Sequence, residues 1–322
     1  MSFKLLFSLI KDKHLIYSAL ILFALCVTSN AGTITVSKTY DSDYKSIQEA
    51  IKAASSGDII DVGPGIYNES LIINTSITIK GAGPNFSIIN STYNMANTSQ
   101  NTIQIVNESI RVHLQGIAII SNKDGILSDK NYVTVTVKNC IITGGDNGIK
   151  VKGLSCSISL INNTIINNRL SGIDGTDGHP SYPTSFLIIG NIIAYNSIGI
   201  NLKTSHSRTL NYNNLYQNTT THYSTNIGKG PNSISKNPLF VDQQSGNYVL
   251  AFDSPCINTG AEGLAYQDPD GSINDIGAYA GPDAITFWPY PVDGPVVSNF
   301  IISPTSVAKG EKIKIRVEGR IR

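Results

Sequence analysis

The sequence predicts an all-β fold in which the chain winds into a parallel β-helix. One short phrase recurs at steps of 23, 24, 28 and 22 residues, and it opens at Gly116, Asn139, Asn163, Asn191 and Asn213. Apolar and polar residues alternate inside each repeat, as in VTVTVK at 133–138. A fixed period of this length indicates stacked repeats, and alternation with period two indicates strands. Each repeat is therefore expected to form one coil.

A second series of residues supports the same register. Glycines follow the first series after 8 or 9 residues, at Gly125, Gly148, Gly172 and Gly199. In this alignment two inward ladders of isoleucine form two walls, Ile149 with Ile173 and Ile200, and Ile141 with Ile165 and Ile193. Asparagines at the corners are expected to adopt the tight backbone angles of a bend and to hydrogen-bond to the next coil.

The N-terminus has the organisation of a signal peptide. Lys4, Lys11 and Lys13 precede an apolar run at 15–27, and Ala31 ends a small-residue cleavage site. Residues 1–31 are therefore predicted to be removed on secretion, which implies a secreted or cell-surface protein that meets the membrane only through this segment. An uncleaved anchor is the alternative, although the apolar run is short for a bilayer.

Charge and cysteine content narrow the function classes. The formal net charge is +1, with 15% charged residues and no later basic run, which argues against nucleic acid as a partner. The mature chain would keep Cys140, Cys156 and Cys256, an odd and widely spaced set that indicates neither a disulfide framework nor a zinc site.

A capping helix is expected before the first coil. Ile47, Ala50, Ile51 and Ala54 share one helical face, and Ser46 is placed to be the N-cap. A solenoid needs such a cover because its first coil otherwise exposes core and unpaired strand edge.

Here the sequence resembles a known superfamily. Residues 46–69 (SIQEAIKAASSGDIIDVGPGIYNE) and 77–81 (ITIKG) are similar to the opening of right-handed, single-stranded parallel β-helix proteins of the pectin-lyase-like superfamily. The resemblance implies a β-helix domain over 32–282. Residues 237–282, with DIGAY at 275–279, resemble the closing segment of secreted bacterial and archaeal β-helix proteins and are expected to cap the far end.

The last forty residues read as separate from the solenoid. Residues 283–295 are rich in proline and are predicted to be a linker. Residues 296–322 resemble the first strands of an immunoglobulin-like repeat, too few to bury a core alone. Either the chain is a fragment of a longer protein or this tail pairs with another partner.

Two outward ladders carry the candidate binding residues. The glycine register places Lys150, Asp174 and Asn201 in one ladder, and Lys152, Thr176 and Lys203 in the next. Two lysines beside an aspartate could hold an acidic sugar. Lys150 and Asp174, one strand apart, could equally form an ordinary surface ion pair.

Candidate catalytic residues lie where one repeat is about five residues longer. The insertion brings Asp177, His179 and Tyr182 beside Asp174. Asp174, Asp177 and His179 could perform acid–base chemistry or hold a divalent cation such as Ca²⁺. The alternative is a structural bend, because the segment contains two Asp-Gly pairs and two prolines.

The catalytic motifs of pectin-active enzymes do not transfer to this sequence. Paired aspartates and an R-I-K motif are absent, and only Asp174 with Lys150 or Arg169 suggests a lyase-like set. The favoured function is therefore a secreted or cell-surface protein that binds a polysaccharide or cell-surface glycan, with no cofactor beyond Ca²⁺. The alternatives are a lyase or glycoside hydrolase acting on an acidic polysaccharide, and a structural adhesin or cell-envelope spacer.

Overall fold

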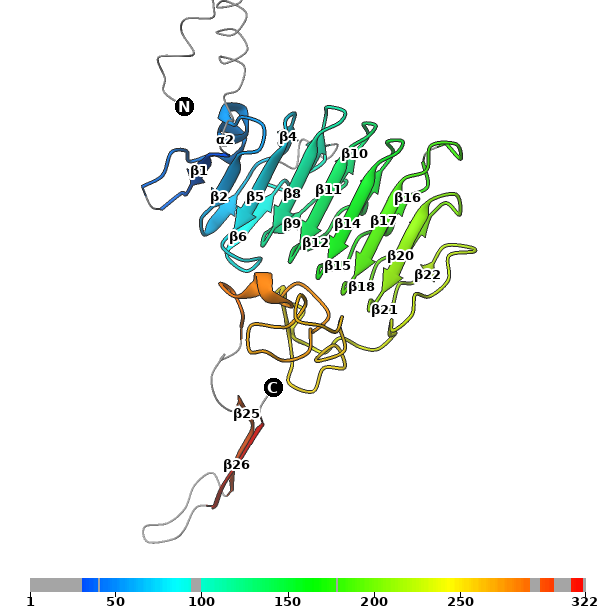
Figure 1. Cartoon of the computed structure of the whole chain (residues 1–322). Coiled ribbons are helices and arrows are strands. Elements are labelled where there is room, and N and C mark those ends of the chain that lie inside the picture. The colour runs from blue at the N-terminus through cyan, green and yellow to red at the C-terminus, as the bar shows by residue number, and fades with distance from the viewer. Residues whose placement is uncertain are drawn as a thin grey trace, which may run out of the picture.

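The computed structural model describes residues 31–39, 41–93, 100–177, 179–289 and the strands at 296–303 and 314–320. Three parallel sheets form the walls of a solenoid, and each coil contributes one strand to each wall (Figure 1). The predicted right-handed parallel β-helix is confirmed.

The three sheets are named in the order in which the chain first enters them. The first sheet contains β1 (Thr33–Val36), β2 (Ile59–Val62), β5 (Ile77–Gly81), β8 (Arg111–Gln115), β11 (Thr134–Lys138), β14 (Ser157–Ile161), β17 (Ser185–Ile189) and β20 (Ser207–Asn211). The second sheet contains β3 (Gly65–Tyr67), β6 (Ser87–Asn90), β9 (Ala118–Ile120), β12 (Ile141–Thr143), β15 (Thr164–Ile166), β18 (Ile192–Ala194) and β21 (Asn214–Tyr216). The third sheet contains β4 (Leu71–Ile73), β7 (Ile103–Ile105), β10 (Ile126–Ser128), β13 (Asn147–Val151), β16 (Ser171–Gly175), β19 (Ile198–Leu202) and β22 (Thr221–Tyr223).

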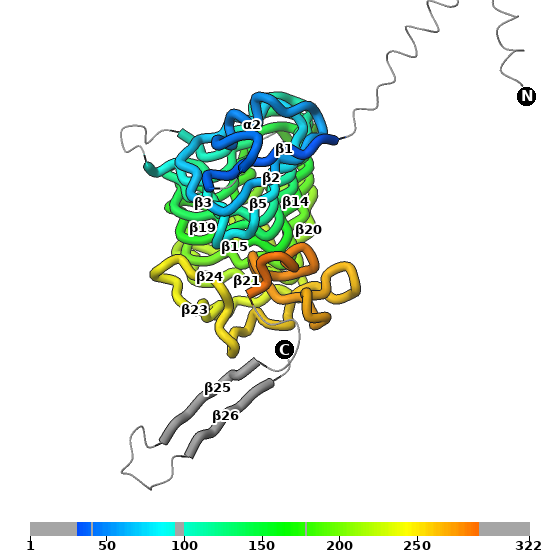
Figure 2. Tube along the Cα trace, turned by 90° about the vertical axis from the view of Figure 1, so that its left-hand side faces the viewer, coloured from blue at the N-terminus to red at the C-terminus, as the bar shows by residue number. Residues whose placement is uncertain are grey.

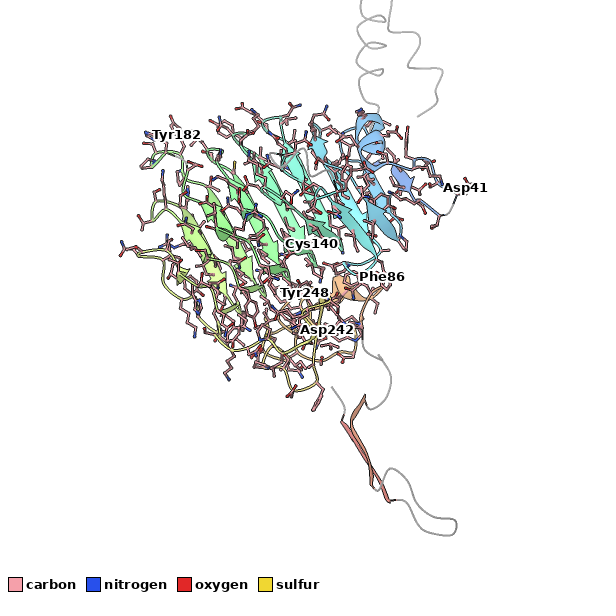
Figure 3. The ribbon with its side chains drawn as sticks, turned by 180° about the vertical axis from the view of Figure 1, so that it is seen from behind. Asp41, Phe86, Cys140, Tyr182, Asp242 and Tyr248 are labelled. Carbon is pink, nitrogen blue, oxygen red and sulfur yellow. The ribbon has the colours of Figure 1, made fainter. Side chains whose placement is uncertain are left out.

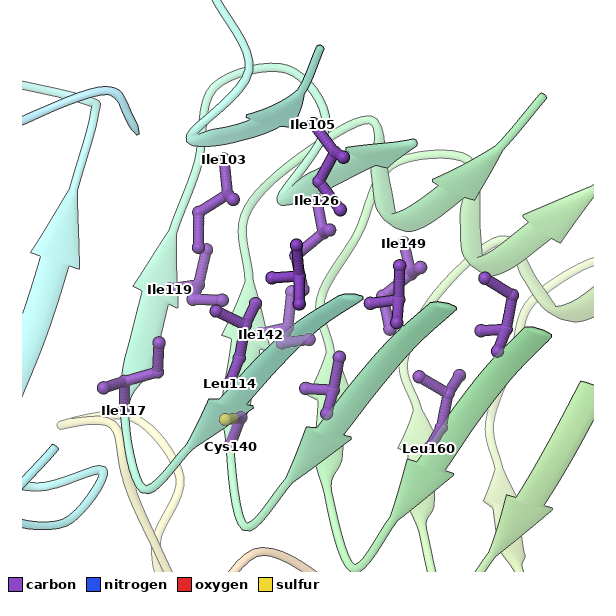
Figure 4. Close-up of a cluster of buried hydrophobic side chains, with 14 of the residues drawn as sticks. Ile103, Ile105, Leu114, Ile117, Ile119, Ile126, Cys140, Ile142, Ile149 and Leu160 are labelled. Carbon is purple, nitrogen blue, oxygen red and sulfur yellow. The ribbon is translucent and has the colours of Figure 1, made fainter. Parts of the chain in front are cut away.

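Aliphatic side chains stack inside the solenoid, coil upon coil (Figure 4). The predicted ladder of Ile149, Ile173 and Ile200 is confirmed by the register of the third sheet. The second predicted ladder is wrong at one position, because Ile142 rather than Ile141 pairs with Ile165. Ile141 faces outward instead, where the closing segment buries it.

The corner positions explain that one-residue error. Asn139 has φ of 51° and follows Lys138, which pairs with Gln115 and Ile161, so it aligns with Gly116 and Asn162. Cys140 takes the following position, where its amide donates to Oδ1 of Asn163 at 3.0 Å. Gly and Asn both tolerate a left-handed corner, so the spacing alone did not separate the two columns.

A buried amide ladder joins the last coils. Nδ2 of Asn163 donates to Oδ1 of Asn191 at 2.9 Å, and Nδ2 of Asn191 donates to Oδ1 of Asn213 at 3.0 Å. The same two oxygens also accept the backbone N–H of the preceding asparagine. A second ladder of this kind runs through Asn168, Asn196 and Asn218. These asparagines therefore satisfy buried polar backbone, but the prediction that they also form the bend is wrong for Asn163, Asn191 and Asn213, because the left-handed corners lie one residue earlier, at Asn162, Gly190 and Tyr212.

The helix α2 (Ile47–Ala53) covers the first coil, as predicted (Figure 2). Ser46 is its N-cap, and its hydroxyl accepts from the backbone N–H of Glu49 at 3.3 Å. The carboxylate of Glu69 accepts from the N–H groups of Ile47 and Gln48, which satisfies donors at the helix start. Ile47 and Ile51 are buried in the solenoid core.

The closing segment does not cap the far end, and this expectation is corrected. Ile227, in the chain after β22, enters the solenoid core at that end. The closing segment, with β23 (Phe240–Asp242) and β24 (Asn247–Leu250), folds back along the outside of the second sheet instead (Figures 1 and 2). It covers an outward apolar stripe that includes Ala118, Ile141 and Ile192. Burial of that stripe is the reason for the lateral position.

The first residues of the predicted linker also pack on the solenoid. They include a short 3₁₀ helix, η2 (Pro282–Ala284). Asp283 forms an ion pair with Lys138 at 3.1 Å, and Phe287 is buried near Gly83 and Gly116. The closing segment therefore continues to residue 288 in the structure.

The remaining sequence predictions lie partly outside the described residues. Residues 1–30 of the predicted signal peptide and 290–295 of the predicted linker are not described. β25 (Val296–Ser303) and β26 (Lys314–Arg320) form an antiparallel pair, and the immunoglobulin-like assignment stays a prediction. Among the residues that the structure describes, none belongs to a helix of sufficient length and apolarity to span a bilayer.

A buried carboxyl group organises the closing segment. Asp268 accepts hydrogen bonds from the backbone of Asp275 at 2.9 Å and from the backbone of Gly281. Burial, followed by the negative charges of Asp275 and Asp270, raises the pKa of Asp268 to about 8. The segment is therefore organised around a buried carboxyl group that binds a proton more readily than an exposed aspartate does.

Replacing Asn191 by Ala is expected to destabilise the fold by about 3 kcal/mol, because it leaves buried carbonyl and N–H groups of two neighbouring coils without partners. Urea unfolding followed by circular dichroism measures the change. Asn211→Ala is the matched control, because Asn211 is half-buried and, among the described residues, its side-chain oxygen accepts only from the backbone N–H of Tyr212. Equal losses in both variants would contradict a special role for the ladder.

Stability is expected to fall as pH rises from about 4 to about 8. The pKa of Asp268 is 3.8 when unfolded and about 8 when folded, so its contribution is complete below the lower value and is lost as pH rises through the upper one. Asp268→Asn should flatten this part of the profile of unfolding free energy against pH. Asp253→Asn, at an exposed position, should keep the wild-type slope. An unchanged slope in Asp268→Asn would refute the assignment.

Candidate functional site

The outward ladder of Lys150, Asp174 and Asn201 exists as predicted. Strand register places the three residues side by side on β13, β16 and β19. Nζ of Lys150 lies 3.2 Å from Oδ2 of Asp174, and the backbone and hydroxyl of Thr176 donate to Oδ1 of Asp174 at 3.2 and 2.8 Å. The charge of Asp174 is thus already compensated by neighbours in its own sheet.

Electrostatics strengthen this internal pairing. Burial alone would lower the pKa of Lys150, but the carboxylates of Asp174, Asp124 and Asp177 outweigh it, so the pKa is raised. Asp174 itself is buried, with 7% of its surface exposed. The geometry therefore favours the structural ion pair over a site that grips a sugar. Lys152 and Lys203, at exposed positions just beyond these strands, extend the predicted face.

Among the described residues neither Asp177 nor His179 forms a side-chain hydrogen bond or ion pair with Asp174, although the Asp177 carboxylate lies close enough to Lys150 to help raise its pKa. Asp177 and His179 are exposed in the loop after β16. Nδ1 of His179 accepts from the backbone of Ser181 at 3.2 Å, and its ring lies 6.0 Å from that of Tyr182. Figure 3 shows Tyr182 at the outer edge of the solenoid, on the loop that projects from the coils. Within the described residues no hydrogen bond or ion pair joins the side chain of His179 to an aspartate, so the catalytic role stays a prediction.

His206, which the sequence reading missed, anchors this loop. Nδ1 of His206 accepts from the N–H of Thr184 at 3.1 Å, so Nε2 carries the hydrogen. Nε2 then donates to the carbonyls of Gly175 at 2.8 Å and Asp177 at 3.2 Å. His206 is buried against Phe186, and no spacing pattern distinguishes it, because its partners are all backbone groups.

The suggested partner Arg169 is committed elsewhere. Nε of Arg169 donates to Oδ1 of Asp146 at 2.9 Å, and Nη1 donates to the carbonyl of Gly144 at 3.0 Å. These bonds hold a corner of the solenoid. Arg169 therefore does not complete a lyase-like set with Asp174.

A different face offers an open groove. The first sheet faces the viewer in Figure 1, and the closing segment lies below it. A groove of about 620 Å³ crosses its early strands. Arg111 and His113 alternate along β8 and so project from the same side of the sheet, flanked by the hydroxyls of Thr78, Thr134 and Thr136. Within the part of the chain that the structure describes, no carboxylate lines this groove.

Arg111 and His113 have unused hydrogen-bonding capacity. Within the described part of the chain the guanidinium of Arg111 forms no ion pair, and Nε2 of His113 is buried with no partner. Burial, together with the charge of Lys138, lowers the pKa of His113, although Asp283 opposes the shift. His113 is therefore neutral at pH 7. The groove presents one cation and a row of hydroxyls, and the half-buried imidazole of His113 lies beside them with its Nε2 covered.

The sequence did contain a signal for this face. In VTVTVK the valines point inward, so Thr134 and Thr136 must point outward in register with Arg111 and His113. Only the closing segment's position shows that this face, rather than the second, is left open.

A family model described as "Periplasmic copper-binding protein (NosD)" matches residues 51–251, more than half of the 322-residue chain. The chain belongs to the NosD family. The match and the coil architecture confirm the predicted right-handed β-helix of the pectin-lyase-like superfamily.

Individual relatives are more distant. A cell surface glycoprotein of Methanothermus fervidus is 32% identical over 132 residues, which are 39% of this chain and 21% of that protein. The chain thus matches about a fifth of this relative's length. A pectin methylesterase from Aspergillus niger aligns with a TM-score of 0.37 and 15% identity, over 65% of this chain and 86% of that one. The pectate lyase Pel9A aligns with a TM-score of 0.38 and 11% identity, over 78% of this chain and 96% of that one. No residue role is carried over from these structures.

The residues described in this NosD-family chain do not fit a copper ion. Among them no group of three His, Cys, Asp or Glu side chains converges, and Met1 and Met95 lie outside them. Cys140, Cys156 and Cys256 are buried in different segments, and burial raises the pKa of Cys140 and Cys256 to about 12. Protonated, separated thiols are poor metal ligands. Ca²⁺ at Asp174 and Asp177 stays a prediction.

Replacing His206 by Ala is expected to release the loop after β16, because the buried N–H of Thr184 loses its acceptor at a cost of about 1–3 kcal/mol. Amide hydrogen exchange at Thr184 should accelerate strongly. His179→Ala, at an exposed position in the same loop, should leave this exchange rate unchanged. Slow exchange at Thr184 in the His206→Ala variant would contradict the anchoring role.

Proposed function

We propose that this NosD-family chain is a β-helix module of a cell-surface or cell-envelope protein that binds an acidic polysaccharide without cleaving it. The groove on the first sheet would be the binding face, and the Arg111 guanidinium would be the principal contact for the anionic groups of the ligand. The observation that carries the proposal is the position of Arg111, which forms no ion pair among the described residues, beside His113 and flanking hydroxyls in an open groove of about 620 Å³.

The chemistry of the groove supports a polysaccharide ligand. A guanidinium binds a carboxylate through two parallel hydrogen bonds, which suits the acid group of a uronic sugar. Threonine hydroxyls both donate and accept, as sugar hydroxyls do. Because Thr78, His113 and Thr136 occupy the same position on successive strands, their side chains form a row along the solenoid. A linear polymer can follow such a row across several strands.

The setting supports a surface or envelope location. The relative from Methanothermus fervidus is named as a cell surface glycoprotein, and the family description is periplasmic. The predicted signal peptide over 1–31 agrees with both. An envelope module meets polysaccharides as neighbours.

Binding without cleavage is favoured by the lining of the groove. Glycoside hydrolysis ordinarily needs two carboxyl groups at the scissile bond, and none of the described residues that line this groove carries a carboxylate. Asp174, the strongest carboxylate candidate from the sequence, is paired with Lys150 and Thr176 on the third sheet. The enzymatic alternative therefore has less structural support than the binding function.

Arg111→Ala is expected to weaken binding to a uronic acid homopolymer by about tenfold or more, which corresponds to losing a charged hydrogen bond of roughly 1.5–3 kcal/mol. Calorimetry on the full chain measures the affinity, and ultraviolet absorbance reports unsaturated cleavage products. Lys152→Ala is the matched control, because it removes a positive charge from the third-sheet face that the sequence favoured.

Three outcomes would overturn this proposal. If Lys152→Ala rather than Arg111→Ala weakens binding, the ligand lies on the third sheet. If the wild-type chain binds no acidic polymer, the function is wrong. If unsaturated or reducing ends accumulate, the protein is an enzyme.

A further inference from the structure

A second hollow lies between the closing segment and the outer face of the second sheet. The turn between β23 and β24 stands away from β6, β9 and β12 and leaves a groove of about 630 Å³. Figure 3 shows Asp242 and Tyr248, which bracket this turn, close together beside the coils. The groove does not share a lining residue with the groove on the first sheet.

The floor of this groove is aliphatic. Ile88, Ile120 and Ile141 come from three successive strands of the second sheet and line it. Over the later coils the same outward stripe is covered by the closing segment, as at Ile192. Ile88 and Ile120 are half-buried, so part of their apolar surface remains accessible from the groove, whereas Ile141 is buried beneath the closing segment.

The walls carry amide groups. Asn85 lies on one side, and Gln243, Gln244 and Asn247 lie on the turn. The side chains of Gln243 and Gln244 form no hydrogen bond among the described residues. An amide donates and accepts hydrogen bonds. None of the described residues that line the groove is Lys, Arg, Asp or Glu.

The turn is held in shape before any ligand arrives. Oδ1 of Asp242 accepts from the N–H of Ser245 at 3.3 Å, and the Ser245 hydroxyl donates to the carbonyl of Asp242 at 3.2 Å. Oδ1 of Asn247 accepts from the N–H of Val249 at 3.2 Å. Preorganised walls reduce the entropy lost on binding.

We propose that this groove is a second binding site, for a neutral oligosaccharide. A sugar ring has an apolar face of C–H groups for the isoleucine floor and hydroxyls that pair with the amides of Gln243 and Gln244. A charged ligand would lose hydration without gaining a counter-ion. The volume falls within the range of roughly 300–1,000 Å³ typical of small-ligand sites. The inference rests on this groove alone and is independent of the proposed acidic ligand.

The test uses the full chain and defined tetrasaccharides of glucose, xylose, N-acetylglucosamine and galacturonic acid. Calorimetry should detect at least one neutral tetrasaccharide, and hydrogen exchange should show added protection at 243–248. The double variant Gln243→Ala, Gln244→Ala should weaken that binding by about tenfold or more. Gln104→Ala, on the outer side of the third sheet, is the matched control and should leave it unchanged.

The outcomes separate this site from the groove on the first sheet. Arg111→Ala should leave neutral binding intact, whatever it does to acidic polymers. The inference is overturned if no neutral tetrasaccharide binds at millimolar concentration. It is also overturned if the double variant, shown to be folded by a thermal unfolding transition, binds as the wild type does. Preference of this groove for the galacturonic acid probe would also overturn it.

Discussion

Parallel stacking of one coil on the next is the constraint on which the whole molecule depends. Each strand satisfies its backbone groups through its neighbours, and the side-chain amides of the ladder asparagines bond chiefly to the coils beside them. Asn191 accepts from the preceding coil and donates to the next, so register is imposed along the axis. An insertion has to leave the stack as a loop, as the segment after β16 does.

Because the stack buries all inward side chains in the same way, its three outer faces are free to differ. The second sheet is apolar outside and is largely covered by the closing segment. The third sheet neutralises its own charges through Lys150 and Asp174. The first sheet stays open and keeps Arg111 unpaired. Binding of an acidic polysaccharide is therefore proposed on the first sheet, where polar groups lack partners among the described residues. The neutral site is proposed on the second sheet, where the turn of the closing segment stands away from the apolar face.

Much of the fold could be predicted from residue patterns. The coil period, the helix α2 and the pairing of Lys150 with Asp174 all follow from local periodicity. The spacing aligned Asn139 with Asn163, one position too far along, because Gly and Asn are equally tolerated in a left-handed corner. His206 and the groove at Arg111 were missed. His206 hydrogen-bonds to backbone carbonyls and a backbone N–H, which no sequence pattern marks. Arg111 became a candidate only because the closing segment covers the second sheet and leaves the first sheet open.

Period-two alternation repeated in every coil predicts the solenoid from residue order, because it leaves a single set of side chains to bury. Spacing also predicts the outward ladder of Lys150, Asp174 and Asn201, although it places Ile141 on the wrong side of its strand. Which outer face the closing segment covers became visible only in the folded molecule. That choice depends on the complementary shape of two apolar surfaces more than a hundred residues apart, since Ile141 belongs to the same buried cluster as Tyr279 and Phe287. No local pattern encodes such a fit, so the candidate sites emerged from packing.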